Sequence, residues 1–351
     1  MDVEFLPFIT ELIQSPILLV ITALCVGVII VNGATDAPNA IATVVSTRSL
    51  SPRVAIIMAA TCNFFGLLVI TLVSSAVAAT IFNMVDFGGD STHALIALLA
   101  AMVAIIVWGV TAWYFGLPTS QSHSLIAGLT GAAIALQGGF GGINGAEWMK
   151  VIYGILLSTF MGFASGWLLS KLIEKIFKNA SRQKTDNFFK WGQIFGGAGV
   201  AFMHGAQDGQ KFMGIFLLAI TLATTGMSNG SSMDLPVWLM IFCALCMGIG
   251  TAVGGQKIIK SVGMDMVKLD RYQGFSASMG TFLCLVVSTF GGLPVSTTHT
   301  ASTTIMGVGA ARRKSAVKWG IAIDMVKTWV LTFPGCGLMG FVFAKIFLMF
   351  A

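Results

Sequence analysis

Two similar stretches decide the architecture of this chain: Gly116-Leu-Pro-Thr-Ser-Gln-Ser-His-Ser124 and Gly292-Leu-Pro-Val-Ser-Thr-Thr-His-Thr300. Each follows a long apolar segment and precedes a helical run of small residues, 125–136 in the first copy and 301–311 in the second. Proline suits the first turn of a helix, where its missing N–H is not needed. Each copy therefore predicts a new helix that starts inside the protein, with its free backbone N–H groups pointing inward.

A second motif repeats in the same order. Asn32-Gly-Ala-Thr-Asp-Ala-Pro-Asn39 is similar to His204-Gly-Ala-Gln-Asp-Gly-Gln-Lys211, and both motif pairs recur at an offset of about 175 residues. Chance rarely supplies two motifs in one order at nearly one spacing. We therefore interpret the chain as two repeats, residues 1–175 and 188–351, joined by a basic linker at 176–187.

The composition places these repeats in a membrane. Of 351 residues, 56% are hydrophobic and 10% are charged, whereas about 25% of the residues in a soluble domain are charged. So few charges cannot cover a globule of this size, and lipid is the expected solvent. The apolar blocks reach or approach the roughly 20 residues that cross the hydrocarbon core as a helix.

The hydrophilic breaks between apolar blocks predict the topology. Basic residues gather in four breaks, at 48–53, 171–190, 257–271 and 312–318. Almost none occur at the N-terminus or in the breaks at 84–93, 137–147 and 226–234. By the positive-inside rule the first set is cytoplasmic and the second set is outside. Residues 94–136 and 272–311 must then each enter and leave on one side, either by crossing twice or as a re-entrant hairpin.

Both versions, ten crossings or six plus two hairpins, place the two termini outside and give each half an odd number of crossings. The second half is therefore inverted relative to the first. The predicted fold is an all-α integral membrane protein with two inverted-topology repeats of about five membrane segments each, and with broken or re-entrant helices at the midplane. Secondary transporters typically have this organisation, and their sites form where the repeats meet. A duplication without a transport role is the alternative.

The first motif pair predicts a cation site. Pro38 and the glycines of both copies are expected to break their helices at 33–38 and 205–209, exposing carbonyls beside a carboxylate. An ionised aspartate in the bilayer costs roughly 3 kcal/mol unless it is paired, so it marks a functional site. The predicted cation ligands are Asn32, Thr35, Asp36, Asn39, Gln207 and Asp208, with Na⁺ or a proton held at Asp36 and Asp208. The simpler alternative is that both aspartates only cap helices.

The second motif pair predicts an anion site, because a helix N-terminus carries about half a positive charge and binds anions. The predicted oxyanion ligands are Thr119, Ser120, Gln121, Ser122, His123, Ser296, Thr297, Thr298 and His299. Two such termini from inverted repeats would hold one tetrahedral oxyanion. The simpler alternative is that these hydroxyls only cap buried helices. Lys211 stands where the first repeat has Asn39, and it would offset the anion charge or pair with Asp208.

Together the four motifs resemble those of the inorganic phosphate transporter (PiT) family of sodium- or proton-coupled symporters, and most closely its bacterial members. Each half of that family carries a GAND-type motif followed by a P-(V/I)-S-(T/G)-T-H-type motif. Residues 33–36 and 205–208 match the first motif, and residues 118–123 and 294–299 match the second. The resemblance implies an oxyanion at the two Ser/Thr turns and cations near the two aspartates. The family asparagine before each aspartate is replaced here by Thr35 and by Gln207.

The predicted function is therefore import of inorganic phosphate by symport with H⁺ or Na⁺ through alternating access, and not an enzymatic reaction. A sulfate or other oxyanion permease of the same fold is the alternative, and a channel or a membrane enzyme is less favoured. No cofactor is expected beyond the coupling cation. The expected partners are phosphate, that cation and the bilayer of the cell (inner) membrane, without nucleic acid and with a homodimer left open.

Overall fold

The computed structural model of this chain describes residues 5–88, 90–114, 119–225, 235–265 and 267–350. Within these ranges, the side chains at 37–39, 113, 182, 225, 255–265 and 321 are not described. The described residues form helices and connecting turns, with one isolated antiparallel bridge between Val85 and Ile143.

The helices follow one another along the chain as α1 (Phe5–Gln14), α2 (Pro16–Ser46), α3 (Pro52–Val73), α4 (Ala76–Phe82), α5 (Ser91–Tyr114), α6 (Gln121–Gln137), α7 (Gly145–Leu156), α8 (Gly162–Ile176), α9 (Arg182–Thr225), α10 (Val237–Asp265), α11 (Arg271–Phe290), α12 (Thr297–Arg312) and α13 (Trp319–Leu348). A π-helical segment, Leu157–Met161, joins α7 to α8 without a break. Among the described residues, seven helical segments are long and apolar enough to cross a membrane. These features confirm the predicted class of all-α membrane protein.

The helices form an elongated bundle whose outer surface is apolar. Large apolar side chains such as Ile57, Leu72, Val330 and Leu338 are about two-thirds exposed on its outer faces. Polar and charged side chains in the middle of α9, among them His204, Asp208 and Lys211, are instead buried, and α9 packs against α2, α3 and α11. An apolar exterior around a polar interior is the arrangement expected when lipid is the solvent.

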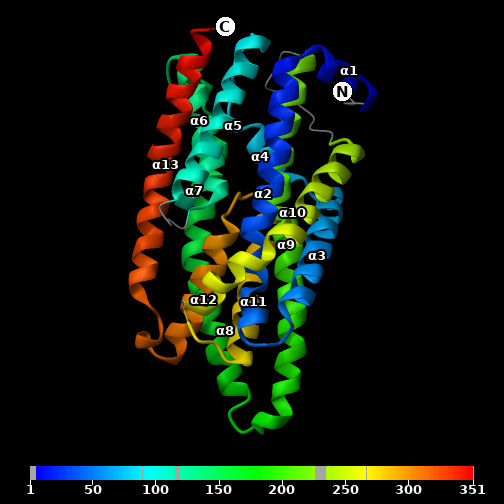
Figure 1. Cartoon of the computed structure of the whole chain (residues 1–351). Helices are drawn as coiled ribbons and strands as arrows, with labels where there is room; N and C mark the ends of the chain where they lie inside the picture. The colour runs from blue at the N-terminus through cyan, green and yellow to red at the C-terminus, as the bar shows by residue number, and fades with distance from the viewer. Residues whose placement is uncertain (1–4, 89, 115–118, 226–234, 266, 351) are drawn as a thin grey trace.

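The α2–α3, α8–α9 and α12–α13 connections and the start of α11 lie together at one end of the bundle, as expected for four breaks predicted to be cytoplasmic (Figure 1). Arg271 at the start of α11 pairs with Asp186 at the start of α9. Arg312 at the end of α12 lies 3.6 Å from Asp270, which precedes α11. The turn before α3 donates hydrogen bonds to Gln193 Oε1 in the first part of α9. The α11–α12 unit therefore begins and ends at this end.

Two of the breaks with few basic residues lie against each other at the opposite end. Asp86 N donates to Gly142 O at 2.8 Å, and Asn144 N donates to Met84 O at 3.1 Å. The α5–α6 unit therefore begins and ends at this second end, where Figure 1 also places α1 and the last turns of α13. Each of the two units, α5–α6 and α11–α12, therefore returns to the end of the bundle from which it started.

The predicted helix breaks in the first motif pair are wrong. α2 is helical through 33–38, and α9 is helical through 205–209. The glycines instead allow close helix packing. A Cβ atom at Gly33 would lie 2.5 Å from Met247 O in α10, and one at Gly205 would lie 2.2 Å from Asn63 O in α3. Small residues of this kind let the backbones of membrane helices approach each other, and such helices also tolerate proline.

Candidate functional site

Asp208, in the middle of α9, connects elements from the first and second halves of the chain. It is fully buried, and its Oδ1 accepts a hydrogen bond of 2.7 Å from Lys211 Nζ. Its Oδ2 accepts bonds from Thr297 Oγ1 at 3.1 Å and from Asn32 Nδ2 at 3.5 Å. The carboxylate of one motif is thus bound directly to residues of two others.

Asp36 is also buried and faces the same cluster. Asn32 Nδ2, which reaches Asp208, lies 3.1 Å from Asp36 Oδ2. Among the described atoms, the buried Asn32 Oδ1 has no hydrogen-bond donor. Two carboxylates and an amide oxygen without a donor form an acceptor-rich group, and hard oxygen atoms of this kind are the ligands that Na⁺ prefers.

Lys211 lies one turn beyond Asp208 on α9 and is fully buried. Its ammonium group donates to Asp208 Oδ1 at 2.7 Å, to Ser122 Oγ at 2.8 Å and to Val295 O. An ammonium group has three N–H donors, so these three oxygens satisfy it completely. Through Ser122, the lysine joins the fourth motif to the cluster.

Two largely buried helices, α6 and α12, present their N-termini to this cluster. The N-cap residues of α6 and α12 are Ser120 and Ser296. Their hydroxyls accept bonds from His123 N at 3.4 Å and from His299 N at 3.3 Å. A new helix therefore starts in each motif, as predicted, but Pro294 lies two residues before the N-cap of α12 and not in its first turn. Residues 115–118, including Pro118, lie outside the described part of the chain. Each serine acts as a cap, but a hydroxyl that accepts a bond can still donate one.

The two predicted histidine ligands lie against each other. The rings of His123 and His299 have centroids 4.5 Å apart and meet edge to face. His123 also packs on Phe333, and His299 packs on Trp329, both from α13. All four ring nitrogens are buried without a hydrogen-bond partner among the described residues.

The remaining predicted ligands are more dispersed. Thr119 Oγ1 lies 3.1 Å from Thr332 Oγ1 in α13, and Gln121 and Thr298 are half-buried in the first turns of their helices. Thr35 donates back to Val31 O within α2. Gln207 Nε2 donates to the end of α11 and to the turn before Pro294. The side chain of Asn39 lies outside the described residues.

A polar chain behind Asp208 was not predicted. His204 Nε2 lies 3.3 Å from Asp208 Oδ2, and its Nδ1 lies 3.0 Å from Asn63 Oδ1. Asn63 Nδ2 in turn donates to Thr251 Oγ1 at 2.9 Å. The signal in the sequence was Asn63 itself, an amide side chain within an otherwise apolar block.

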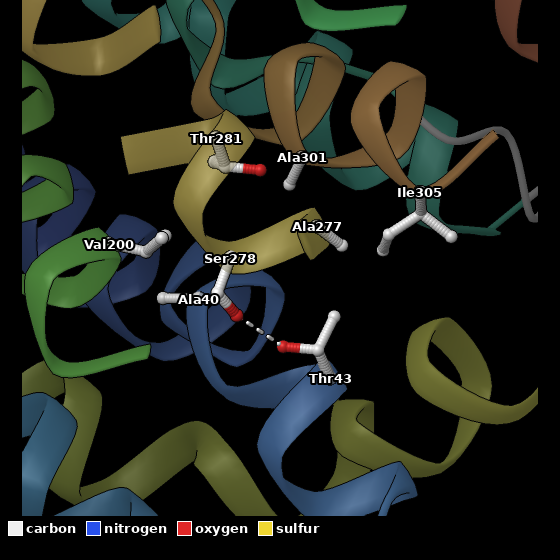
Figure 2. Close-up of a pocket in the computed structure, with 8 residues that line it drawn as sticks. All are labelled: Ala40, Thr43, Val200, Ala277, Ser278, Thr281, Ala301 and Ile305. Atoms are coloured by element: carbon white, nitrogen blue, oxygen red, sulfur yellow. Dashed lines mark hydrogen bonds between the residues drawn. The ribbon is translucent and has the colours of Figure 1, made fainter. Parts of the chain in front are cut away.

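A small pocket lies one turn from the cluster, toward the end with the basic breaks. Figure 2 shows its lining residues, which come from α2, α9, α11 and α12: Ala40, Thr43, Val200, Ala277, Ser278, Thr281, Ala301 and Ile305. A hydrogen bond of 3.0 Å between Thr43 Oγ1 and Ser278 Oγ joins α2 to α11 across it. The pocket therefore lies between one helix from the first half of the chain, α2, and three from the second half, α9, α11 and α12.

Comparison with known proteins identifies the family of this chain. The sequence pattern of the Phosphate transporter family matches residues 32–340. The chain belongs to this family. A relative from Bacillus subtilis, described as a "probable low-affinity inorganic phosphate transporter", is 40% identical over 92% of this chain and 94% of its own length. One from Rhizobium meliloti with the same description is 38% identical over the same shares.

The fold of this family member is also found among solved structures. A protein titled "the sodium-dependent phosphate transporter" superimposes with a TM-score of 0.84 over 96% of this chain and 100% of its own, at 21% sequence identity. The two proteins therefore share a fold. The named relatives are transporters and not enzymes, in agreement with the sequence analysis.

Proposed function

We propose that this phosphate transporter family member imports inorganic phosphate by symport with a cation, H⁺ or Na⁺, through alternating access. The observation that carries the proposal is the convergence of all four motifs on Asp208 and Lys211. A polar cluster this deep in an apolar bundle is costly, so it marks the substrate path of a transporter.

The anion part of the proposal rests on the two helix N-termini. The first turns of α6 and α12 approach the same cluster, since Ser122 and Thr297 bond to Lys211 and Asp208 respectively. Phosphate would be held between these termini by backbone N–H groups, by the hydroxyls of the two motifs, and by His123 and His299. Contacts to N–H groups and hydroxyls bind an oxyanion but also allow its release.

The cation part rests on the acceptor groups. Asp36, Asp208 and the amide oxygen of Asn32 would hold the coupling cation, with Gln207 close by. Nearby carboxylates would also discriminate between oxyanions, because the monoanion of phosphate can donate a hydrogen bond to an acceptor and sulfate cannot.

The topology that we propose is six full crossings and two re-entrant hairpins, α5–α6 and α11–α12, arranged in two inverted repeats. In support, the two hairpin units start from opposite ends of the bundle (Figure 1). The repeats would be residues 1–175 and 188–351, with the basic breaks in the cytoplasm and both termini outside.

Alternating access would use the pocket of Figure 2 as the start of the inner path. It lies between the cluster and the end with the basic breaks, and the hydrogen bond between Thr43 Oγ1 and Ser278 Oγ joins α2 to α11 across it. Separation of these two helices would open the cluster to the cytoplasm.

The test is uptake of radiolabelled phosphate into proteoliposomes with imposed Na⁺ or proton gradients and with sulfate as competitor. Saturable uptake that follows one gradient and is indifferent to sulfate would support the proposal and identify the coupling ion. Gradient-driven uptake of sulfate but not of phosphate would make sulfate the substrate. Downhill phosphate flux that is indifferent to both gradients would mean uncoupled transport and contradict symport.

A further inference from the structure

Lys211 is placed as a metal cation would be placed. Its ammonium nitrogen lies among a carboxylate oxygen of Asp208, the hydroxyl of Ser122 and the main-chain carbonyl of Val295. Carboxylate, hydroxyl and carbonyl oxygens are the ligand types that bind alkali cations in transporters built from repeats. The three oxygens come from α9, α6 and the turn before α12, so they are assembled by the fold.

A simple ion pair would not need this arrangement. Lys211 and Asp208 are three residues apart on one helix and could pair without any other group. Instead Lys211 also donates to Ser122 in the first turn of α6 and to the carbonyl of Val295, just before α12. The N-termini of both helices already carry the positive end of a helix dipole. A positive charge there weakens stability, so its position calls for a functional reason.

The matching position in the other copy of the motif carries no positive charge. Lys211 stands where the first repeat has Asn39, a neutral residue. The first repeat therefore supplies a carboxylate, Asp36, without a lysine at the matching position. The two halves of the cluster differ in that one half carries its own cation.

We propose that the ammonium group of Lys211 is a tethered cation that permanently fills one of two cation positions in the transport site. This proposal rests on the proposed symport function. Two carboxylates and one ammonium leave a single formal negative charge before phosphate arrives. The lysine thus lowers by one the number of cations that must accompany each phosphate, and Na⁺ or a proton is taken only on the Asp36 side.

Removal of the lysine should open its position to Na⁺. In Lys211→Asn the three oxygens remain and the side chain adds a fourth, while Lys211→Ala leaves the space vacant. We expect each purified variant to bind one more ²²Na⁺ per chain than the wild-type protein in equilibrium binding. Phosphate uptake by Lys211→Asn should then require Na⁺ more strongly than wild-type uptake does.

The matched control is Lys327→Asn, which removes an ammonium group that pairs with Asp324 on an exposed face of α13. It should gain no Na⁺. Folded Lys211 variants, judged by thermal unfolding, that bind no additional Na⁺ would overturn the proposal. If neither variant folds, the number of Na⁺ ions bound by the wild-type protein tests the proposal. At most one Na⁺ per chain supports a tethered cation, and two or more would rule it out.

The binding assay also separates this inference from the proposed function. It needs no transport, so it tests the tethered cation even if wild-type proteoliposomes take up no phosphate. Conversely, wild-type phosphate uptake together with unchanged Na⁺ binding in the variants would keep the symporter and reject the tethered cation.

Discussion

Asn32 Nδ2 lies 3.5 Å from Asp208 Oδ2, although the two residues are 176 positions apart in the chain. The same nitrogen lies 3.1 Å from Asp36 Oδ2. One amide group is therefore shared by the carboxylates of both copies of the motif. Two buried carboxylates this close repel each other unless positive charge lies between or beside them. The relationship leads to the first prediction.

Asp208→Asn and Asp36→Asn are each expected to abolish coupled phosphate uptake, but with different effects on stability. Asp208→Asn leaves the ammonium group of Lys211 buried without its carboxylate, which costs about 3–5 kcal/mol. Asp36 bonds to the neutral Asn32, so its substitution should cost less. Proteoliposome uptake and thermal unfolding in detergent measure the two effects.

The control for Asp208 is the double variant Asp208→Asn/Lys211→Met, which removes both charges. It should recover much of the stability, because no unpaired ammonium group is left buried. It should recover none of the uptake, because the transport site then lacks both the Asp208 carboxylate and the ammonium group of Lys211. Wild-type uptake by folded Asp208→Asn protein would contradict the cation-site assignment.

Ser120→Ala and Ser296→Ala are expected to weaken phosphate binding. Each removes the cap of a helix N-terminus that we place against the anion. Each also removes a hydroxyl that would donate to the bound anion. A hydrogen bond to a charged group contributes about 1.5 kcal/mol, which corresponds to a roughly tenfold higher half-saturation concentration. Ser120→Thr, which keeps a capping hydroxyl, is the matched control. Half-saturation that is unchanged in both alanine variants would move the substrate away from these turns.

Gly205→Ala is expected to destabilise the protein and to lower uptake. The added Cβ would lie 2.2 Å from the main-chain oxygen of Asn63, so α9 and α3 must move apart. Overpacking of this kind costs about 1–3 kcal/mol. Gly27→Ala in α2 is the control, because a Cβ there has no neighbour within 4 Å. An equal melting temperature for the two variants would show that close packing at Gly205 is unimportant.

Ser278→Cys, in a background without the six native cysteines, tests the proposed inner path. A membrane-impermeant thiol reagent should modify it only from the side with the basic breaks, because the pocket lies toward that end. Saturating phosphate and coupling cation should change the rate by shifting the population that is open inward. Modification only from the opposite side would contradict the assigned direction of the pocket.

The sequence predicted more about which residues gather than about the shape of their helices. Gly33 and Gly205 were interpreted as helix breakers, yet each lies in a continuous helix. A glycine that breaks a helix and a glycine that admits a neighbouring backbone look alike in sequence. The difference lies in Met247 and Asn63, which are distant along the chain. A new helix in each Ser/Thr motif was predictable because capping residues act locally, although Pro294 lies before the N-cap and not in the first turn.

The contacts of Lys211 were also only partly predictable from local sequence. Its pairing with Asp208 follows from a separation of three residues on one helix. Its bonds to Ser122 and to the carbonyl of Val295 depend on where α6 and α12 lie relative to α9, which no local pattern encodes. The chain from His204 to Thr251 was missed for the same reason.

The covalent attachment of the Lys211 ammonium group has an electrical consequence. A cation that enters with phosphate moves through the membrane voltage, which contributes about 2.3 kcal/mol per charge for each 100 mV. A lysine in a buried turn of α9 balances negative charge but does not travel with the cargo. If its position were filled by Na⁺ instead, each phosphate would bring one more charge inward. The voltage would then support a steeper accumulation of phosphate, at the cost of one more ion to be pumped out afterwards.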